Sequence, residues 1–204
     1  MNKTLLTQTS LDTYKDLYPE DRRLQALTLA ELIANTKDIE VDFSSLTFPE
    51  EDELLEGTAL ECGLSIGYVV FDCVCLFLGA VTLRGGLTKE AAESVAEAAK
   101  PVASALEKTI AKMAEEGASK YDVACGVFRV ISTIYSGGCL GAVLGAFLGS
   151  LTWYTAALYG VTAMATIVAA LATDGAAEIG LIVVELATAG FLISDSVNAV
   201  EACK

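Results

Sequence analysis

The chain has 204 residues, and its 27 acidic and 13 basic residues give a net charge of −14, which excludes the basic surface that nucleic-acid binding requires. It contains no histidine, so histidine triads, histidine general bases and zinc sites with histidine ligands are excluded as well. Because 53% of the residues are hydrophobic, acidic and apolar residues must be concentrated in different parts of the chain.

The first 60 residues are the most acidic part of the chain. They hold 13 acidic and 5 basic residues, which is more than half of the net negative charge. Apolar residues at helical spacing, with Pro19 before them, predict an amphipathic helix from Asp21 to Asn35. The segment 36–49 is predicted to be an extended linker. Since residues 1–8 hold no apolar run of secretory length, we expect a soluble cytoplasmic protein made without a signal peptide, with later release and membrane association left open.

Two further helices are predicted before residue 117. Pro49 and the acidic residues 50–53 favour a helix start, and this helix is expected to run to Leu83, before a Gly-Gly stop. Thr88 is predicted to cap a third helix over residues 89–116, with a kink at Pro101.

Ser119, with Asp122 three residues later, predicts a capping box and the start of a fourth helix. The last helix is predicted over residues 175–202. No series of alternating strands is present, so we expect an all-α fold, a compact helical bundle of five to seven helices around a central apolar hairpin. The acidic segment 1–49 is expected to precede this bundle, which takes residues 50–204.

The hairpin is predicted from Val130 to Thr173, which are 44 residues without a single charged side chain. The run divides near Trp153 and Tyr154 into the segments 130–149 and 154–173, each 20 residues long. A helix needs about 20 apolar residues to cross a bilayer, and aromatic residues favour its interfaces. The hairpin therefore suits two membrane crossings, although a hairpin buried within a soluble bundle would be equally uncharged.

Glycines recur every fourth residue in the first half of the hairpin, at Gly137, Gly141, Gly145 and Gly149. Positions four apart share one face of a helix, and a glycine face lets another backbone approach closely. Each glycine inside a helix costs about 1 kcal/mol relative to alanine, so packing must recover this cost. We interpret the four glycines as a surface for helix packing or membrane insertion.

Carboxylates in apolar surroundings are candidate pH sensors. Asp72 interrupts an apolar helix, and Asp174, Glu178 and Glu185 lie within about 40° of one another on a helical projection. The alternatives are a solvated acidic stripe and an acid trigger, in which protonation removes the cost of moving these groups into lipid.

No catalytic, metal or cofactor site is predicted. The carboxylate pattern of di-metal bundles requires histidine, no calcium loop is present, and no nucleophile has a recognisable activating partner. The six cysteines, at positions 62, 73, 75, 125, 139 and 203, include no Cys-x-x-Cys pair, and in a reducing compartment we expect buried thiols rather than disulfides.

The layout, a helical domain of about 200 residues with a long uncharged hairpin towards its C-terminal half, resembles the pore-forming domain of colicins. That resemblance implies a hairpin that is buried in a soluble bundle and inserts on contact with a membrane. Three blocks, at residues 151–154, 172–177 and 194–200, also resemble a family of uncharacterised predicted proteins, which implies no activity.

The leading hypothesis is therefore a pore-forming protein that is soluble at rest, inserts its hairpin on acidification and self-associates on a lipid bilayer. The alternative is a non-catalytic interaction module that binds a protein partner or an apolar ligand through its glycine face.

Overall fold

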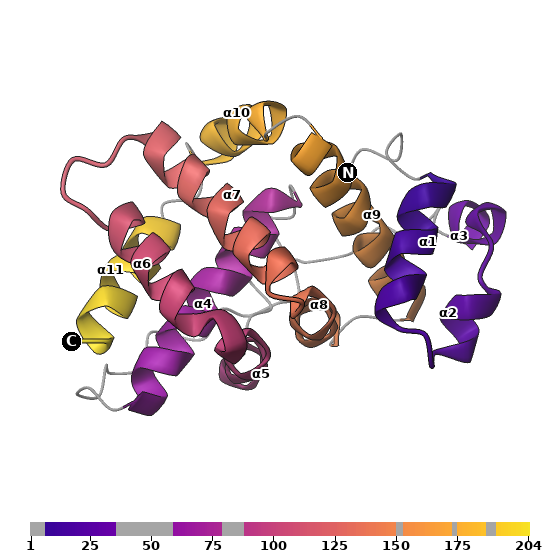
Figure 1. The fold of residues 1–204 in the computed structure, drawn as a ribbon, viewed down its shortest axis with the longest axis horizontal. Helices are drawn as coiled ribbons and strands as arrows, with labels where there is room; N and C mark the ends of the chain where they lie inside the picture. The colour runs from indigo at the N-terminus through magenta and orange to yellow at the C-terminus, as the bar shows by residue number, and fades with distance from the viewer. Residues whose placement is uncertain (1–6, 36–58, 79–87, 150–152, 173–174, 187–190) are drawn as a thin grey trace.

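The computed structural model describes residues 7–35, 59–78, 88–149, 153–172, 175–186 and 191–204, and every regular element in these ranges is a helix. The predicted all-α fold class is confirmed. In chain order the α-helices are α1 (Gln8–Leu17), α2 (Arg22–Ala26), α3 (Leu29–Asn35), α4 (Ala59–Phe77), α5 (Lys89–Ala99), α6 (Ala103–Met113), α7 (Lys120–Ser136), α8 (Leu140–Leu148), α9 (Trp153–Ala172), α10 (Ala176–Glu185) and α11 (Phe191–Ala202) (Figure 1).

The N-terminal region holds three short helices where one was predicted. α1 was not foreseen. It begins at a capping box in which Thr7 and Ser10 bond each other's backbone N–H groups. The helix predicted from Asp21 to Asn35 is instead divided into α2 and α3, because Leu27 between them has an extended backbone.

Local signals in the middle of the chain are confirmed. The Thr88 hydroxyl caps α5 by accepting a hydrogen bond from the Ala91 N–H at 3.2 Å. Pro101 lies in a 3₁₀ turn over Lys100–Val102 that separates α5 from α6, as the predicted kink requires. The capping box of Ser119 and Asp122 starts α7.

α4 is the central helix. It packs against α5, α6, α7, α10 and α11, and residues 69–78 are all buried. The closest approach is to α5, where Gly67 faces the backbone of Ala92. The predicted limits of this helix, at residue 50 and at Leu83, lie outside the described residues.

The expected 20-residue crossing over residues 130–149 is wrong. α7 ends at Ser136, and Gly138 takes a left-handed conformation, with φ of 71°, that stops the helix. α8 then leaves at an angle of 113° to α7. The second half of the hairpin does form one helix, α9. Among the described helices, none has both the length and the apolarity to cross a bilayer alone, and the α7–α8 pair reaches that length only across its bend.

The expectation that all cysteines are thiols is also wrong. Cys62 at the start of α4 and Cys203 at the end of α11 form a disulfide, although 141 residues separate them in sequence. The packing of α11 on α4 brings them together, with a Cα–Cα distance of 4.7 Å. Cys73, Cys75, Cys125 and Cys139 form no disulfide, as expected.

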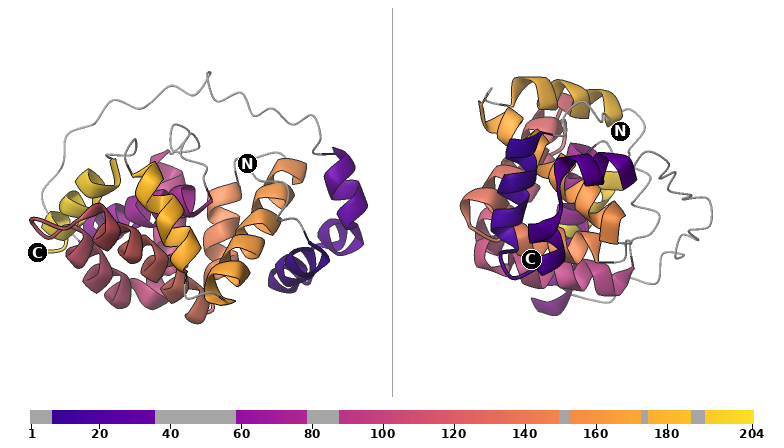
Figure 2. Two further views of the ribbon diagram at one scale, coloured as in Figure 1. Left: turned by 90° about the horizontal axis from the view of Figure 1, so that it is seen from above. Right: turned by 90° about the vertical axis from the view of Figure 1, so that its right-hand side faces the viewer.

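The helices are spread along the long axis of the molecule, but not in chain order. α1, α2 and α3 lie at one end beside α9, whereas α6, α11 and the C-terminus lie at the other (Figures 1 and 2). Leu11, Tyr14 and Leu32 join the N-terminal helices to the apolar core that the other helices share. The predicted boundary between residues 49 and 50 lies outside the described residues.

Candidate functional site

The four predicted glycines do not share one helix face. Gly137 caps the end of α7, where an added Cβ would lie 2.3 Å from a methyl group of Val102. Only Gly141 and Gly145 lie within α8, and Gly149 follows its end and faces the backbone of its own helix. The predicted continuous glycine face is therefore wrong, because the helix breaks and turns between Gly137 and Gly141.

The two glycines within α8 receive the C-terminal end of α1. A Cβ at Gly141 would lie 3.4 Å from the Leu17 Cβ, and one at Gly145 would lie 3.5 Å from the Tyr18 hydroxyl. The Tyr18 hydroxyl also donates a hydrogen bond to the Gly141 carbonyl. Within this fold the glycine pair thus forms a packing surface for the protein's own N-terminal helix.

A third glycine, Gly160 in α9, allows α1 to pack even more closely. A Cβ there would lie 2.2 Å from Cζ of Tyr14, so only glycine leaves room for this ring. Tyr14 is 6% exposed and meets Tyr18 edge to face, with ring centroids 5.2 Å apart. Tyr14 in α1 and Tyr18, which follows its end, therefore anchor α1 on α8 and α9.

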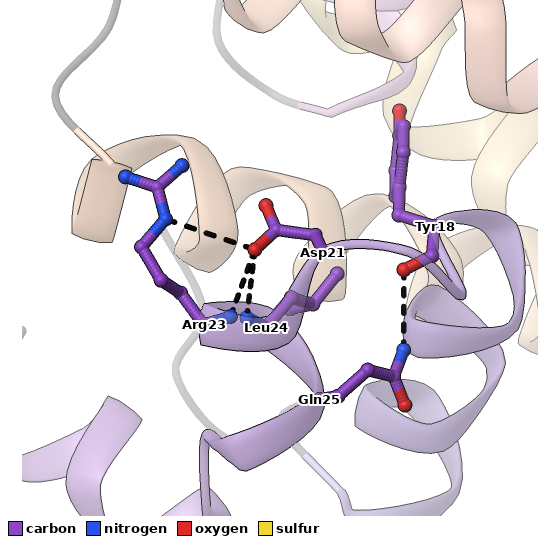
Figure 3. A network of polar contacts seen from close by, with 5 residues as sticks. All are labelled: Tyr18, Asp21, Arg23, Leu24 and Gln25. Carbon is purple, nitrogen blue, oxygen red and sulfur yellow. Dashed lines mark hydrogen bonds and ion pairs between the residues drawn. The ribbon is translucent and has the colours of Figure 1, made fainter.

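Polar contacts hold α2 against the end of α1 (Figure 3). Asp21 caps α2, since its Oδ1 accepts hydrogen bonds from the backbone N–H groups of Arg23 at 2.9 Å and Leu24 at 3.2 Å. Gln25 Nε2 donates to the carbonyl oxygens of Lys15 at 3.0 Å and Tyr18 at 3.2 Å. These bonds make α1 and α2 a single unit.

A cleft of about 450 Å³ lies between this unit and the α8–α9 pair. Its walls are mainly apolar, and they include Leu24, Leu148, Trp153, Ala156 and Ala157. The Arg23 guanidinium lies over the Trp153 ring, 5.4 Å from its centroid, and its Nε is 3.7 Å from the Asp21 carboxylate. This arrangement places one cation, held by one carboxylate, against an aromatic wall.

Tyr14, Tyr18 and Asp21 each keep one ionisation state around neutral pH. Burial raises the pKa of Tyr18 to about 12 and that of Tyr14 further, so both remain neutral hydrogen-bond donors. Partial desolvation opposes ionisation of Asp21, but hydrogen bonds from the Leu24 and Arg23 N–H groups outweigh it and lower its pKa. These three groups do not exchange protons near neutral pH, so they suit binding better than proton transfer.

The predicted pH-sensing residues do not form one cluster that the structure describes. Asp72 is fully buried in α4, and Glu185 lies near the end of α10, where desolvation raises its pKa. Glu178 belongs to α10, but its side chain is not described, and Asp174 lies outside the described residues. Of the two aromatic residues, Trp153 lines the cleft, and the side chain of Tyr154 is not described.

Sequence reasoning missed Tyr14, Tyr18, Arg23 and Gly160. A signal for α1 was present, because Leu11, Tyr14, Leu17 and Tyr18 follow the spacing of an apolar helix face. Nothing local marks Gly160 or the pairing of Arg23 with Trp153, since both depend on how distant helices pack.

Among the described residues, no three metal-ligating side chains are placed to share a metal ion. Searches of protein-family models, curated proteins and solved structures found no match to this chain. The resemblances to colicin domains and to uncharacterised proteins therefore stay predictions, and the function must be argued from the site itself.

Proposed function

We propose that the chain is a non-catalytic binding module that takes an anionic amphiphile in the cleft between α1–α2 and α8–α9. The observation that carries this proposal is the placement of Arg23 over Trp153 at the edge of an apolar cleft. The cleft volume of about 450 Å³ lies within the range of roughly 300–1,000 Å³ that small-molecule sites occupy.

The apolar body of the ligand would lie on Trp153, Leu148 and the two alanines of α9. The head would bind Arg23, whose Nε faces Asp21 while its two terminal nitrogens point away from that carboxylate (Figure 3). Terminal guanidinium nitrogens suit a carboxylate or phosphate, which they bind through two parallel hydrogen bonds. The net charge of −14 opposes this binding only weakly at physiological salt, because charges beyond about 8 Å are screened.

Binding can be followed directly, since Trp153 is the single tryptophan of the chain. Titration with dodecanoate is expected to give a saturable change in tryptophan fluorescence. Arg23→Gln should raise the dissociation constant for dodecanoate about tenfold, because it removes a charge-assisted hydrogen bond worth about 1.5 kcal/mol or more. The affinity for dodecanol, which has no charge, should stay unchanged.

Arg22→Gln is the matched control, because it removes the same charge from the neighbouring residue, which is exposed and does not line the cleft. It should leave dodecanoate binding intact. Equal losses in the two variants would mean that net charge, and not the cleft, governs binding. If neither amphiphile gave a saturable change in tryptophan fluorescence, the proposal would be wrong.

A second candidate is the membrane-active protein, a bundle around the apolar pair α8 and α9 that inserts on acidification. The observation that favours it is α10, where Leu181 and Val184 are 67% and 71% exposed beside Glu185. Insertion and self-association would require α1 to leave Gly141 and Gly145, since it now occupies them.

Under this second proposal, leakage of anionic liposomes is expected to appear as the pH falls from 7 to 4. Glu185 has a pKa raised by desolvation, so it gains its proton at a higher pH than an exposed glutamate, and its neutral form enters lipid at lower cost. Glu185→Gln should therefore move the onset of leakage to higher pH, whereas Glu201→Gln, at an exposed position of α11, should not. No leakage at any pH would exclude membrane insertion and leave the binding module untouched.

A further inference from the structure

The Cys62–Cys203 disulfide lies at the far end of the molecule from the Trp153 cleft, and it fastens the last helix to the central one. Cys203 follows the end of α11 and is the penultimate residue of the chain, while Cys62 lies in the first turn of α4. The bond therefore acts at the C-terminal end of α11, and helix ends are where fraying begins.

The fully buried face of α11 is small, although the helix packs against both α4 and α6. Its fully buried residues are Leu192, Ser196 and Ala199, of which Leu192 alone has a large apolar side chain. The Ser196 Oγ is buried and makes no hydrogen bond within the part of the chain that the structure describes. Burial of such a hydroxyl costs free energy, so docking of α11 gains little from this position.

Of the other apolar side chains of α11, Phe191 and Val200 are partly buried and pack against the apolar core. Ile193 and Val197 are 42% and 38% exposed, so they contribute little to the contact with α4 and α6. The disulfide adds a covalent link to the packing that docks α11 on α4 and α6.

The disulfide can also be approached from solvent. Cys203 lines a cleft of about 290 Å³ between α6 and α11, together with Ile66, Ile110 and Val200. Lys108 and Lys204 line the same cleft, along with Glu107. Positive charge near the Cys203 sulfur favours attack on it by a thiolate.

We propose that the Cys62–Cys203 bond is a redox switch, reduced by a dithiol, that controls whether α11 is docked on α4 and α6. A thiolate of the dithiol attacks the Cys203 sulfur, a mixed disulfide forms, and Cys62 leaves as a thiolate that takes a proton. The second thiol of the dithiol then attacks the mixed disulfide and releases Cys203 as a thiol. Two electrons pass to the protein, and the dithiol becomes a cyclic disulfide.

Hydrogen exchange of the full chain at pH 7, with and without dithiothreitol, tests this switch. Reduction is expected to accelerate amide exchange in α11 about tenfold or more, while exchange in α9 stays unchanged. The double variant Cys62→Ser/Cys203→Ser should show fast α11 exchange without reductant and no further response to it. Cys125→Ser, which removes a free half-buried thiol, should keep the full response.

A second substitution separates undocking of α11 from general loosening. Ser196→Ala replaces the buried hydroxyl with an apolar group, so in the double-serine variant it should slow α11 exchange again. If the double-serine variant does not fold, α11 exchange is compared in the natural chain with and without dithiothreitol.

Three outcomes would overturn the proposal. One is unchanged α11 exchange on reduction, and another is equal acceleration in α11 and α9, which would indicate global unfolding. The third is alkylation of all six cysteines when the air-oxidised protein is unfolded in denaturant, which would show that the bond does not form.

Discussion

Replacing Gly67 with valine is expected to lower the free energy of unfolding by about 3 kcal/mol or more. A Cβ at this position of α4 would lie 2.2 Å from the Ala92 carbonyl oxygen and 3.0 Å from the Ala96 Cβ. Because the nearest atom belongs to the backbone of α5, no rotamer change relieves the overlap, and α4 and α5 must move apart. Urea denaturation followed by circular dichroism measures the loss.

Gly63→Val provides a control in the same helix. Gly63 lies one turn earlier in α4, and a Cβ there would meet no atom within 4 Å. Its substitution should change the free energy of unfolding by no more than about 0.5 kcal/mol, since valine and glycine differ little in helix propensity. If both variants lost the same stability, the close packing of α4 on α5 would not be the cause.

Gly67 also illustrates what sequence reasoning can and cannot reach. Signals that act within one turn of helix were interpreted correctly, as for the Thr88 cap, the Pro101 break and the Ser119–Asp122 capping box. In each case the side chain that carries the signal bonds or blocks a backbone group four residues away or less. Such contacts form whatever the rest of the chain does, so the local sequence is sufficient to predict them.

The predicted glycine face failed because a periodic pattern was given more weight than a local stop signal. Spacing by four residues indicated one continuous helix through Gly137, Gly141 and Gly145. The adjacent pair Gly137-Gly138 nevertheless matches the Gly-Gly stop predicted after Leu83, and Gly138 does adopt the left-handed conformation that ends α7. The signal that would have corrected the prediction was therefore present in the sequence.

The cleft and the disulfide had no comparable local signal. Arg23 meets Trp153 across 130 positions, and Cys62 meets Cys203 across 141. Contacts of this kind depend on which helices pack against each other in the folded protein. The spacing of residues along the sequence does not indicate that pairing. The same holds for Tyr14, whose ring occupies the space that Gly160 leaves open.

The Tyr14–Gly160 contact gives the second large expected effect. Gly160→Leu should displace α1 from α9, lower the free energy of unfolding by about 2–3 kcal/mol and weaken dodecanoate binding at least about tenfold. Both effects share one cause, because a Cβ at Gly160 would overlap the buried Tyr14 ring and so move the α1–α2 unit that forms one wall of the cleft. Denaturation and Trp153 fluorescence measure the two effects separately.

Gly180→Leu is the control for this change, since it makes the same substitution on an open face of α10, where a Cβ would meet no atom within 4 Å. It should leave binding unchanged and raise the free energy of unfolding slightly, by about 0.8 kcal/mol at most, because leucine has the higher helix propensity. Tyr14→Ala should weaken binding as well, and combined with Gly160→Leu it should cost less than the sum of the single changes, because each removes the same contact. Full additivity would show that the two residues act independently. Loss of stability with unchanged affinity would show that the N-terminal helices stabilise the fold without forming the binding site.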